Sequence, residues 1–290
     1  MIKVITDSAA DIPKEEAQRY EIDVLAIPIN IDGETFMEGE DMTAKEFYKK
    51  LGKAKALPTT AQVTAMRYLD AYRRAAEMGY EEIVCITITS QGSGMFDAAC
   101  LAKEMFAEDH PQLAERTTIQ VLDSGSYTYD YGHAVVDAAR AAAEERPLEE
   151  VLQVFRRRRE GYQVYFGLTN LTYAKKSGRI TSAAAFVGEM MGFRPIMTIH
   201  KGGTDTLGKV RGDAKLVEAL VKLYQDRRSA DGRGFYIVYA DNKAMGTQLR
   251  KAIEKETKDR CLGEYYIGAS VTINAGPTVF GVIVPVDLVK

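Results

Sequence analysis

A strand-like run, a turn rich in serine and glycine, and a helical pattern follow one another between residues 83 and 106. Residues 83–86 are four apolar side chains typical of a buried strand, and residues 97–106 carry apolar side chains at helical spacing. The same alternation recurs after the strand-like runs at residues 2–6 and 118–122. It predicts an α/β fold, with a largely parallel, helix-covered sheet in the N-terminal half.

The turn itself, residues 87–94, predicts a binding site for an anion. The first amides of a helix have no partners within the helix, and the helix dipole favours negative charge at that end. A second interpretation stays open, in which Ser93 only caps the helix and the neighbouring glycines only form the turn.

Charge and composition exclude several classes of protein. The net charge of −3 argues against a dedicated nucleic-acid binder, and no apolar run approaches the roughly 20 residues that span a bilayer. Residues 1–5 run straight into a strand pattern, so no signal peptide is expected. Cys85, Cys100 and Cys261 have no CxxC spacing, which favours reduced thiols and a cytoplasmic location. The three histidines lack partners at metal-ligand spacing, so no metal site is expected.

The length of 290 residues suits two ordinary domains or one large one. A helical pattern ends before Gly161, and the boundary is predicted there, giving domains of residues 1–160 and 161–290. The second domain again alternates strands and helices, with its strands including residues 164–168, 235–240 and 265–273. The arginine run at residues 156–159 is interpreted as a solvated helix end, or else as a patch that contacts a membrane surface or a partner.

Four loops of the N-terminal half carry clustered hydroxyl groups: residues 6–8, 59–60, 90–94 and 123–124. In open α/β sheets, ligands bind outside the carboxyl ends of the strands, where such loops meet. The loops hold many neutral donors and few general bases. Neutral hydroxyls with helix amides suit a carboxylate in a partly dry site.

Templates for catalysis fit poorly. The sequence around Ser93 is not G-x-S-x-G, no histidine has a matching context for a triad, and no P-loop is present. We therefore expect a binding protein with no catalytic residues rather than an enzyme.

Six motifs together resemble the DegV family of bacterial fatty-acid-binding proteins, the acyl-carrier subunits of fatty acid kinase. Residues 6–13 (TDSAADIP) look like the family's TDSxxDIP, residues 58–62 (PTTAQ) like PTTSQ, and residues 90–96 (SQGSGMF) like SSxLSGTY. Residues 173–180 (YAKKSGRI) are similar to YLxKGGRI, residues 209–212 to KVRG, and residues 274–278 (NAGPT) to HxGPG. The matches are collinear and cover most of the chain.

The resemblance implies two α/β domains that bind one long-chain fatty acid in a tunnel between them, with no cofactor. The carboxylate ligands carry over to Thr60 and Ser93, with the amide of Gly94 assisting. The third ligand of the family is a histidine, and Asn274 stands in its place. Asparagine can donate a hydrogen bond but cannot carry positive charge, so we expect a neutral donor at the head group. The alternative is a protein that prefers another head group or binds an acid more weakly.

Residues 183–193 are predicted to form part of the wall around the acyl tail, with Phe186, Met190 and Met191 as candidate contacts. Small residues leave room there, and methionines adapt to a flexible chain. Ordinary helix packing is the alternative explanation for each of the three. Arg179 and Arg211 match basic positions of the family. They would dock the kinase catalytic subunit or orient an acyl phosphate, or else form surface salt bridges.

The function implied is to present the carboxylate of a bound fatty acid to a separate kinase subunit for phosphorylation. Two alternatives from other classes remain. One is an acyl-transfer or hydrolytic enzyme that uses Ser93 as nucleophile, which needs a histidine within reach. The other is a dihydroxyacetone-type sugar-binding subunit, which the absence of histidine from the polar loops disfavours.

Overall fold

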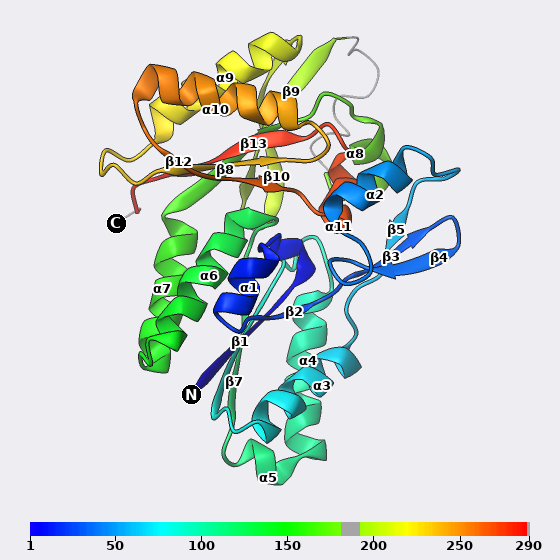
Figure 1. Ribbon diagram of the computed structural model, residues 1–290, viewed down its shortest axis with the longest axis vertical. Coiled ribbons are helices and arrows are strands. Elements are labelled where there is room, and N and C mark those ends of the chain that lie inside the picture. Colours follow the sequence, from blue (N-terminus) through cyan, green and yellow to red (C-terminus); the bar gives the residue numbers. More distant parts are fainter. Residues whose placement is uncertain (181–191, 289–290) are drawn as a thin grey trace.

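Three β-sheets organise the chain in the computed structural model, which describes residues 1–180 and 192–288. Two sheets lie in the N-terminal half, and a larger one lies in the C-terminal half (Figure 1). No helix within these two ranges is long and apolar enough to cross a bilayer. The mixed α/β architecture confirms the predicted fold class.

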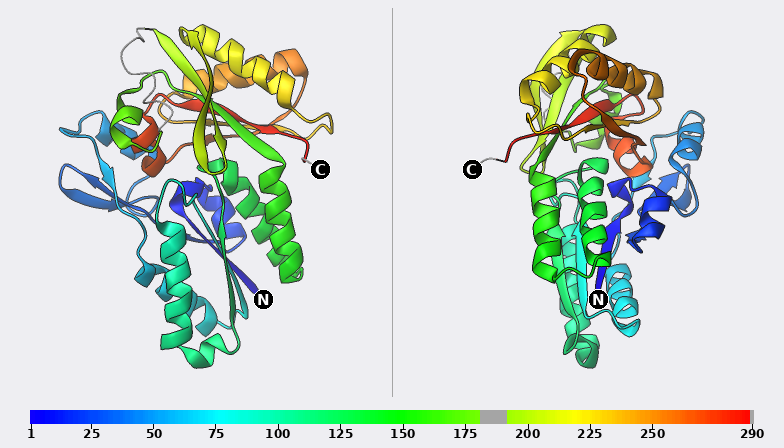
Figure 2. Two further views of the ribbon diagram at one scale, coloured as in Figure 1. Left: turned by 180° about the vertical axis from the view of Figure 1, so that it is seen from behind. Right: turned by 60° about the vertical axis from the view of Figure 1, so that its left-hand side comes forward.

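The first sheet has four parallel strands in the order β2-β1-β6-β7. Its central strands β1 and β6 are mostly buried, because helices cover both faces of the sheet. Helices α3 and α4 pack together on one side, and α6 packs with α7 on the other (Figures 1 and 2). The strands are β1 (Ile2–Asp7), β2 (Asp23–Leu25), β6 (Glu82–Thr87) and β7 (Thr118–Asp123). The helices are α1 (Lys14–Arg19), α3 (Ala65–Glu77), α4 (Met95–Asp109), α5 (Pro111–Ala114), α6 (Tyr129–Ala143) and α7 (Leu148–Glu160), with a 3₁₀ turn at Ser8–Ala10.

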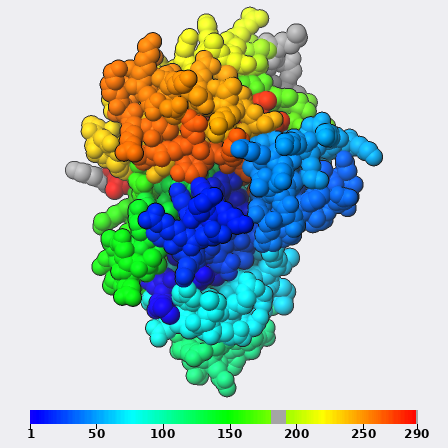
Figure 3. All heavy atoms as spheres, viewed as in Figure 1, coloured from blue at the N-terminus to red at the C-terminus, as the bar shows by residue number. Residues whose placement is uncertain are grey.

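A small antiparallel sheet, β4-β3-β5, projects beside the junction of the two halves (Figure 3). A turn at Asp32-Gly33 joins β3 (Pro28–Ile31) to β4 (Glu34–Met37), with positive φ at both residues. Strand β5 (Thr59–Thr60) completes the sheet. Helix α2 (Ala44–Leu51) begins at a capping box, in which the side chains of Thr43 and Glu46 accept hydrogen bonds from each other's backbone amides.

The third sheet has six strands in the order β10-β9-β8-β13-β11-β12. Only the pair β11 and β12 is parallel. Its strands are β8 (Tyr162–Gly167), β9 (Phe193–His200), β10 (Gly203–Arg211), β11 (Phe235–Tyr239), β12 (Cys261–Tyr266) and β13 (Phe280–Pro285). The helices described in this half are α8 (Thr172–Ser177), α9 (Asp213–Arg227), α10 (Lys243–Thr257) and α11 (Ala269–Ala275).

Side chains of the six-stranded sheet alternate between two apolar cores. Val164 and Phe166 of β8 belong to a core shared with the first half, whereas Tyr165 points to the core under α9 and α10. Alternation of this kind follows from the two-residue period of a strand. The shared core joins the two halves over a broad apolar contact. The division at residues 160 and 161 as a domain boundary stays a prediction.

One predicted element is wrong. Residues 265–273 were expected to form a strand, but β12 ends at Tyr266 and the helix α11 begins at Ala269. The β-branched residues at 271–273 favour a strand locally. Contacts with the first half override this preference, because two of its carboxylates accept hydrogen bonds from amides at the start of α11.

Candidate functional site

A cavity lies between the two halves of the molecule. The cavity has a volume of about 190 Å³, more than ten times the roughly 10–15 Å³ that one water needs. Its buried lining is mainly aliphatic and includes Ile88, Val164, Ile199, Val238 and Val279. Several lining residues are exposed, and the cavity therefore opens to solvent beside them: Thr60, Ala61, Gln62, Gly94 and Arg179.

The Ser93 loop contributes one edge of this opening. It connects β6 to α4, and Ser93 and Gly94 both line the cavity. The N-cap of α4 is Gly94, and no side chain caps the helix. The interpretation of Ser93 as the helix cap is therefore wrong. Its hydroxyl and the uncapped amides of the first turn are the donors that the sequence predicted at this point.

Thr60 lies on the facing edge. It belongs to β5, where it pairs with Ile29 of β3. The next residues bring the two edges into contact, since a Cβ added at Gly94 would lie 2.5 Å from Oε1 of Gln62. The loops after β5 and β6 therefore meet at one mouth. Gln62, which was not predicted as a site residue, belongs to the loop after β5 and contacts Gly94 of the loop after β6.

Helix α11 supplies Asn274 and Ser270 to the lining. The side-chain amide of Asn274 donates to the carbonyl of Ser270 at 2.8 Å. One of its two amide hydrogens is thus used within its own helix, and the other remains for a ligand. Ser270 is buried and was missed because this segment was predicted as a strand.

Asp11 and Glu38 fix the start of α11 from the first half, and the buried carboxylate of Asp7 lies close enough to interact with both through its charge. Asp11 accepts from the amide of Gly268 at 2.9 Å, and Glu38 accepts from the amide of Ser270 at 2.9 Å. Gly268 leaves room for this approach, since a Cβ there would lie 2.5 Å from Oε1 of Glu38.

The same three carboxylates have raised pKa values. Burial raises the pKa of Asp7 to about 6, and hydrogen bonds from Ile88 and Tyr131 oppose the rise. Burial, with the charge of Glu38 nearby, raises the pKa of Asp11 well above its usual range, and burial also raises that of Glu38. The described ranges hold no cluster of three histidine, cysteine or acidic side chains arranged for a metal ion.

The other predicted residues fall into three groups. Arg179 lines the cavity and is exposed at its mouth. Arg211 is exposed on β10 and is not among the described lining residues. The predicted tail contacts Phe186, Met190 and Met191 lie outside the described residues.

The last residue of β7 and the first residue of the loop after it are not among the described residues that line the cavity. Asp123 and Ser124 line a second, more polar hollow with Arg159 and Lys201. Further along the same loop, Tyr127 and Thr128 line the main cavity. Neither was predicted as a site residue, although both lie within four residues of the hydroxyl cluster at residues 123–124 that the sequence singled out.

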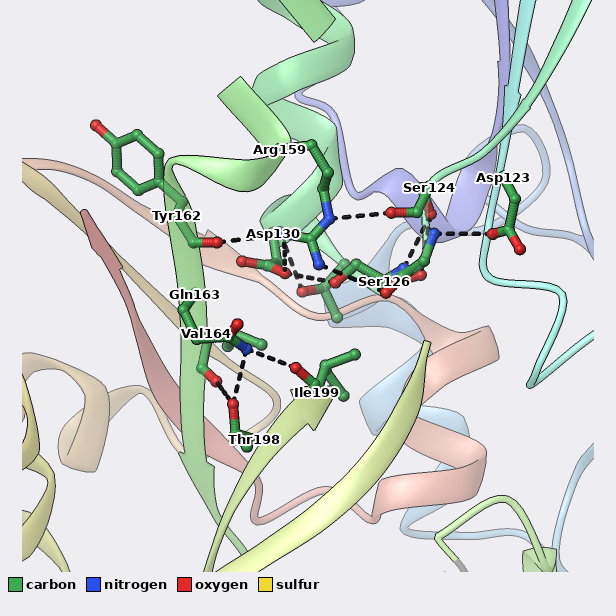
Figure 4. A network of polar contacts seen from close by, with 12 residues as sticks. Asp123, Ser124, Ser126, Asp130, Arg159, Tyr162, Gln163, Val164, Thr198 and Ile199 are labelled. Atoms are coloured by element: carbon green, nitrogen blue, oxygen red, sulfur yellow. Dashed lines mark hydrogen bonds and ion pairs between the residues drawn. The ribbon is translucent and has the colours of Figure 1, made fainter. Parts of the chain in front are cut away.

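Two of the four arginines at residues 156–159 hold this region together, which neither interpretation of the run anticipated. Arg159 donates to the carbonyls of Ser124 and Tyr162 at 3.0 and 3.3 Å and lies 3.4 Å from buried Asp130 (Figure 4). Arg158 pairs with Asp137 and donates to the hydroxyl of Tyr162.

Chemically, this arrangement favours binding. The cavity lining within the described ranges contains hydroxyls, amides and one arginine, but no histidine or carboxylate that could activate Ser93. A polar mouth on an apolar interior suits an amphiphile that carries a single anionic group.

Comparison with known proteins agrees with this description. The family model described as "Uncharacterised protein, DegV family" matches residues 1–286. The chain belongs to the DegV family. A DegV domain-containing protein from Clostridium perfringens is 29% identical over 283 residues, which cover 97% of each chain.

Solved DegV structures share the fold along its whole length. A DegV family protein from Thermus thermophilus, described by its fatty acid binding, is 26% identical, with a TM-score of 0.86 and 99% of each chain covered. A stearic-acid-binding protein from Eubacterium ventriosum is 25% identical, with a TM-score of 0.86 and 98% of each chain covered. These likenesses confirm the predicted family.

Proposed function

We propose that this protein binds one long-chain fatty acid in the cavity between its halves, with the carboxylate at the mouth. The observation that carries the proposal is the polarity of the cavity. Its interior is aliphatic, whereas Thr60, Ser93 and Arg179 gather where it opens. Relatives of the same fold bind fatty acids, which supports this choice of ligand.

The energetics favour a long chain. Each buried methylene contributes about 0.8 kcal/mol, so a chain of about 14 methylenes offers roughly 11 kcal/mol before the cost of association. That cost is about 4–15 kcal/mol, and short acids therefore bind weakly. Hydroxyl and amide donors at the mouth would supply charge-assisted hydrogen bonds and fix the orientation of the acid.

The carboxylate would then be exposed to a second protein. We propose that a separate kinase subunit transfers a phosphoryl group from ATP to one carboxylate oxygen, which forms an acyl phosphate and ADP. The chain's lack of a phosphate loop supports a division of labour in which the partner supplies the catalytic groups. Arg179, at the mouth, is suited to orient the added phosphate.

Native mass spectrometry and titration test the binding step. The purified protein should carry a long-chain acid, and the delipidated protein should rebind palmitic acid with 1:1 stoichiometry. Ser93→Ala and Thr60→Val should each weaken binding. Protein that neither carries nor binds any fatty acid would refute the proposal.

A chemical trap tests the second step. The loaded protein is mixed with ATP and a fatty acid kinase catalytic subunit in the presence of hydroxylamine, which converts an acyl phosphate to a hydroxamate. Hydroxamate should form only when both proteins are present. Binding without hydroxamate would leave a fatty-acid carrier and refute the kinase role.

A further inference from the structure

Tyr127 places a phenol hydroxyl beside the Ser93 loop. It lines the cavity together with Gly92, Ser93 and Gly94. Its ring packs directly on the backbone of Gly92, because a Cβ added at Gly92 would collide with the phenol oxygen and the ring carbons next to it. The hydroxyl therefore lies against the residue that precedes Ser93.

This hydroxyl is available to a ligand. Among the hydrogen bonds of residues 1–180 and 192–288, none uses the Tyr127 oxygen, whereas the hydroxyls of Tyr129, Tyr131 and Tyr162 all donate to protein acceptors. Burial raises the pKa of Tyr127 to about 12, an effect that nearby Arg179 partly offsets. The phenol stays protonated in neutral solution and can only act there as a neutral hydrogen-bonding group.

The backbone that carries Tyr127 is held on both sides. The amide of Thr89 donates to the carbonyl of Ser126 at 3.1 Å, which ties the loop to the Ser93 loop. Arg159 binds the carbonyl of Ser124 from the other side (Figure 4). Thr128, which follows Tyr127, has a φ of +60°, a conformation that a β-branched residue adopts only when its surroundings impose it.

The other hydrogen-bond donors of the site leave room for one more donor at a bound carboxylate. A carboxylate has about four acceptor sites. Thr60 and Ser93 supply one hydroxyl each, while Asn274 already spends one amide hydrogen on its own helix. A donor held in place before the ligand arrives costs little entropy when it binds.

We propose that the phenol hydroxyl of Tyr127 is a ligand of the fatty-acid carboxylate and donates a hydrogen bond to it beside Ser93. This inference rests on the proposed fatty-acid binding. It adds a residue that is not among the motif positions and explains how a site with a neutral residue at position 274 gains a further donor.

The test is Tyr127→Phe, which removes the hydroxyl and keeps the ring on Gly92. Palmitic acid and 1-hexadecanol are titrated into delipidated wild-type and variant protein. Because the variant loses a hydrogen bond to a charged group, its affinity for palmitic acid should fall roughly ten- to hundredfold. The affinity for the alcohol, which has no charged group, should change less than threefold. Tyr20→Phe, a half-buried tyrosine outside the described cavity lining, is the matched control and should leave both affinities unchanged.

The outcomes separate this inference from the proposed function. If the wild-type protein binds palmitic acid and the Tyr127→Phe variant binds it with the same affinity, the role of Tyr127 is refuted while the proposed function stands. Equal weakening of acid and alcohol would also refute it, because it would mean that Tyr127 acts through shape. Failure of wild-type protein to bind palmitic acid would refute the proposed function itself. The thermal midpoint of the variant, expected within about 2 °C of wild type, verifies that it folds.

Discussion

His133 should make the protein less stable in mildly acidic solution. It lies on α6 and is 2% exposed, packed against the rings of Tyr162 and Tyr236 at centroid distances of 4.7 and 5.3 Å. Neither ring nitrogen has a hydrogen-bond partner in the described part of the chain. Burial, together with the charges of Arg158 and Arg159, lowers the pKa of His133 well below 6.5.

The sign and size of the effect follow from proton linkage. A histidine with a lowered pKa in the folded state stays neutral there, while the unfolded chain takes up a proton below pH 6.5. Its contribution to stability is therefore present above that pH and is lost as the pH falls. While the folded imidazole remains neutral, the loss is about 1.4 kcal/mol per pH unit, or about 2 kcal/mol at pH 5.

Urea unfolding of wild type and His133→Phe at pH 8 and pH 5 measures this loss directly. The phenylalanine keeps an aromatic ring in the pocket and cannot titrate. Between pH 8 and pH 5, the difference in unfolding free energy should shift by about 2 kcal/mol in favour of the variant. All other titrating groups cancel in this comparison. His133→Met serves the same purpose if the larger ring does not fit. A difference that stays constant within about 0.5 kcal/mol would refute the reasoning.

Two further predictions concern the contacts that position the site. Glu38→Gln puts an amide donor against the hydroxyl of Ser8 or the amide of Ser270, so the unfolding free energy in urea should fall by about 1–3 kcal/mol. Palmitic acid should also dissociate faster, because α11 is less well held. Unchanged stability would contradict the role of Glu38. Arg159→Ala leaves the buried carboxylate of Asp130 without its charge partner and should cost about 3–5 kcal/mol in the same assay, of which adding Asp130→Asn should restore a part. No recovery in the double variant would mean that the arginine acts mainly through its backbone contacts.

Local signals in the sequence predicted much of the N-terminal half. The strand at residues 83–86 and the turn after it carry an unambiguous pattern, and the capping box of Thr43 and Glu46 marks the start of α2. The loops with Thr60 and Ser93 were identified because hydroxyl groups cluster after strands. Their meeting at one mouth follows from the sheet topology, which brings β5 beside β3 and β6 beside β1.

The parts that were missed depend on contacts between distant segments. Helix α11 is capped by Asp11 and Glu38, which lie more than 200 residues earlier in the chain. No local pattern at residues 269–275 reports those partners, and the β-branched residues there point to a strand. Arg159 looked like a solvated cation because two of the carbonyls that it binds, those of Ser124 and Gly125, belong to the distant loop after β7. Tyr127 was overlooked because a tyrosine in a loop carries no signal until its neighbours are known.

A crystal structure of the protein with stearic acid tests the central claim most directly. We predict continuous density for one acyl chain in the cavity, with the carboxylate within hydrogen-bond distance of the hydroxyls of Thr60 and Ser93. The methyl end should lie among aliphatic residues such as Val164 and Val238. A cavity that contains only water, or an acid bound with its methyl end at Ser93, would contradict the account.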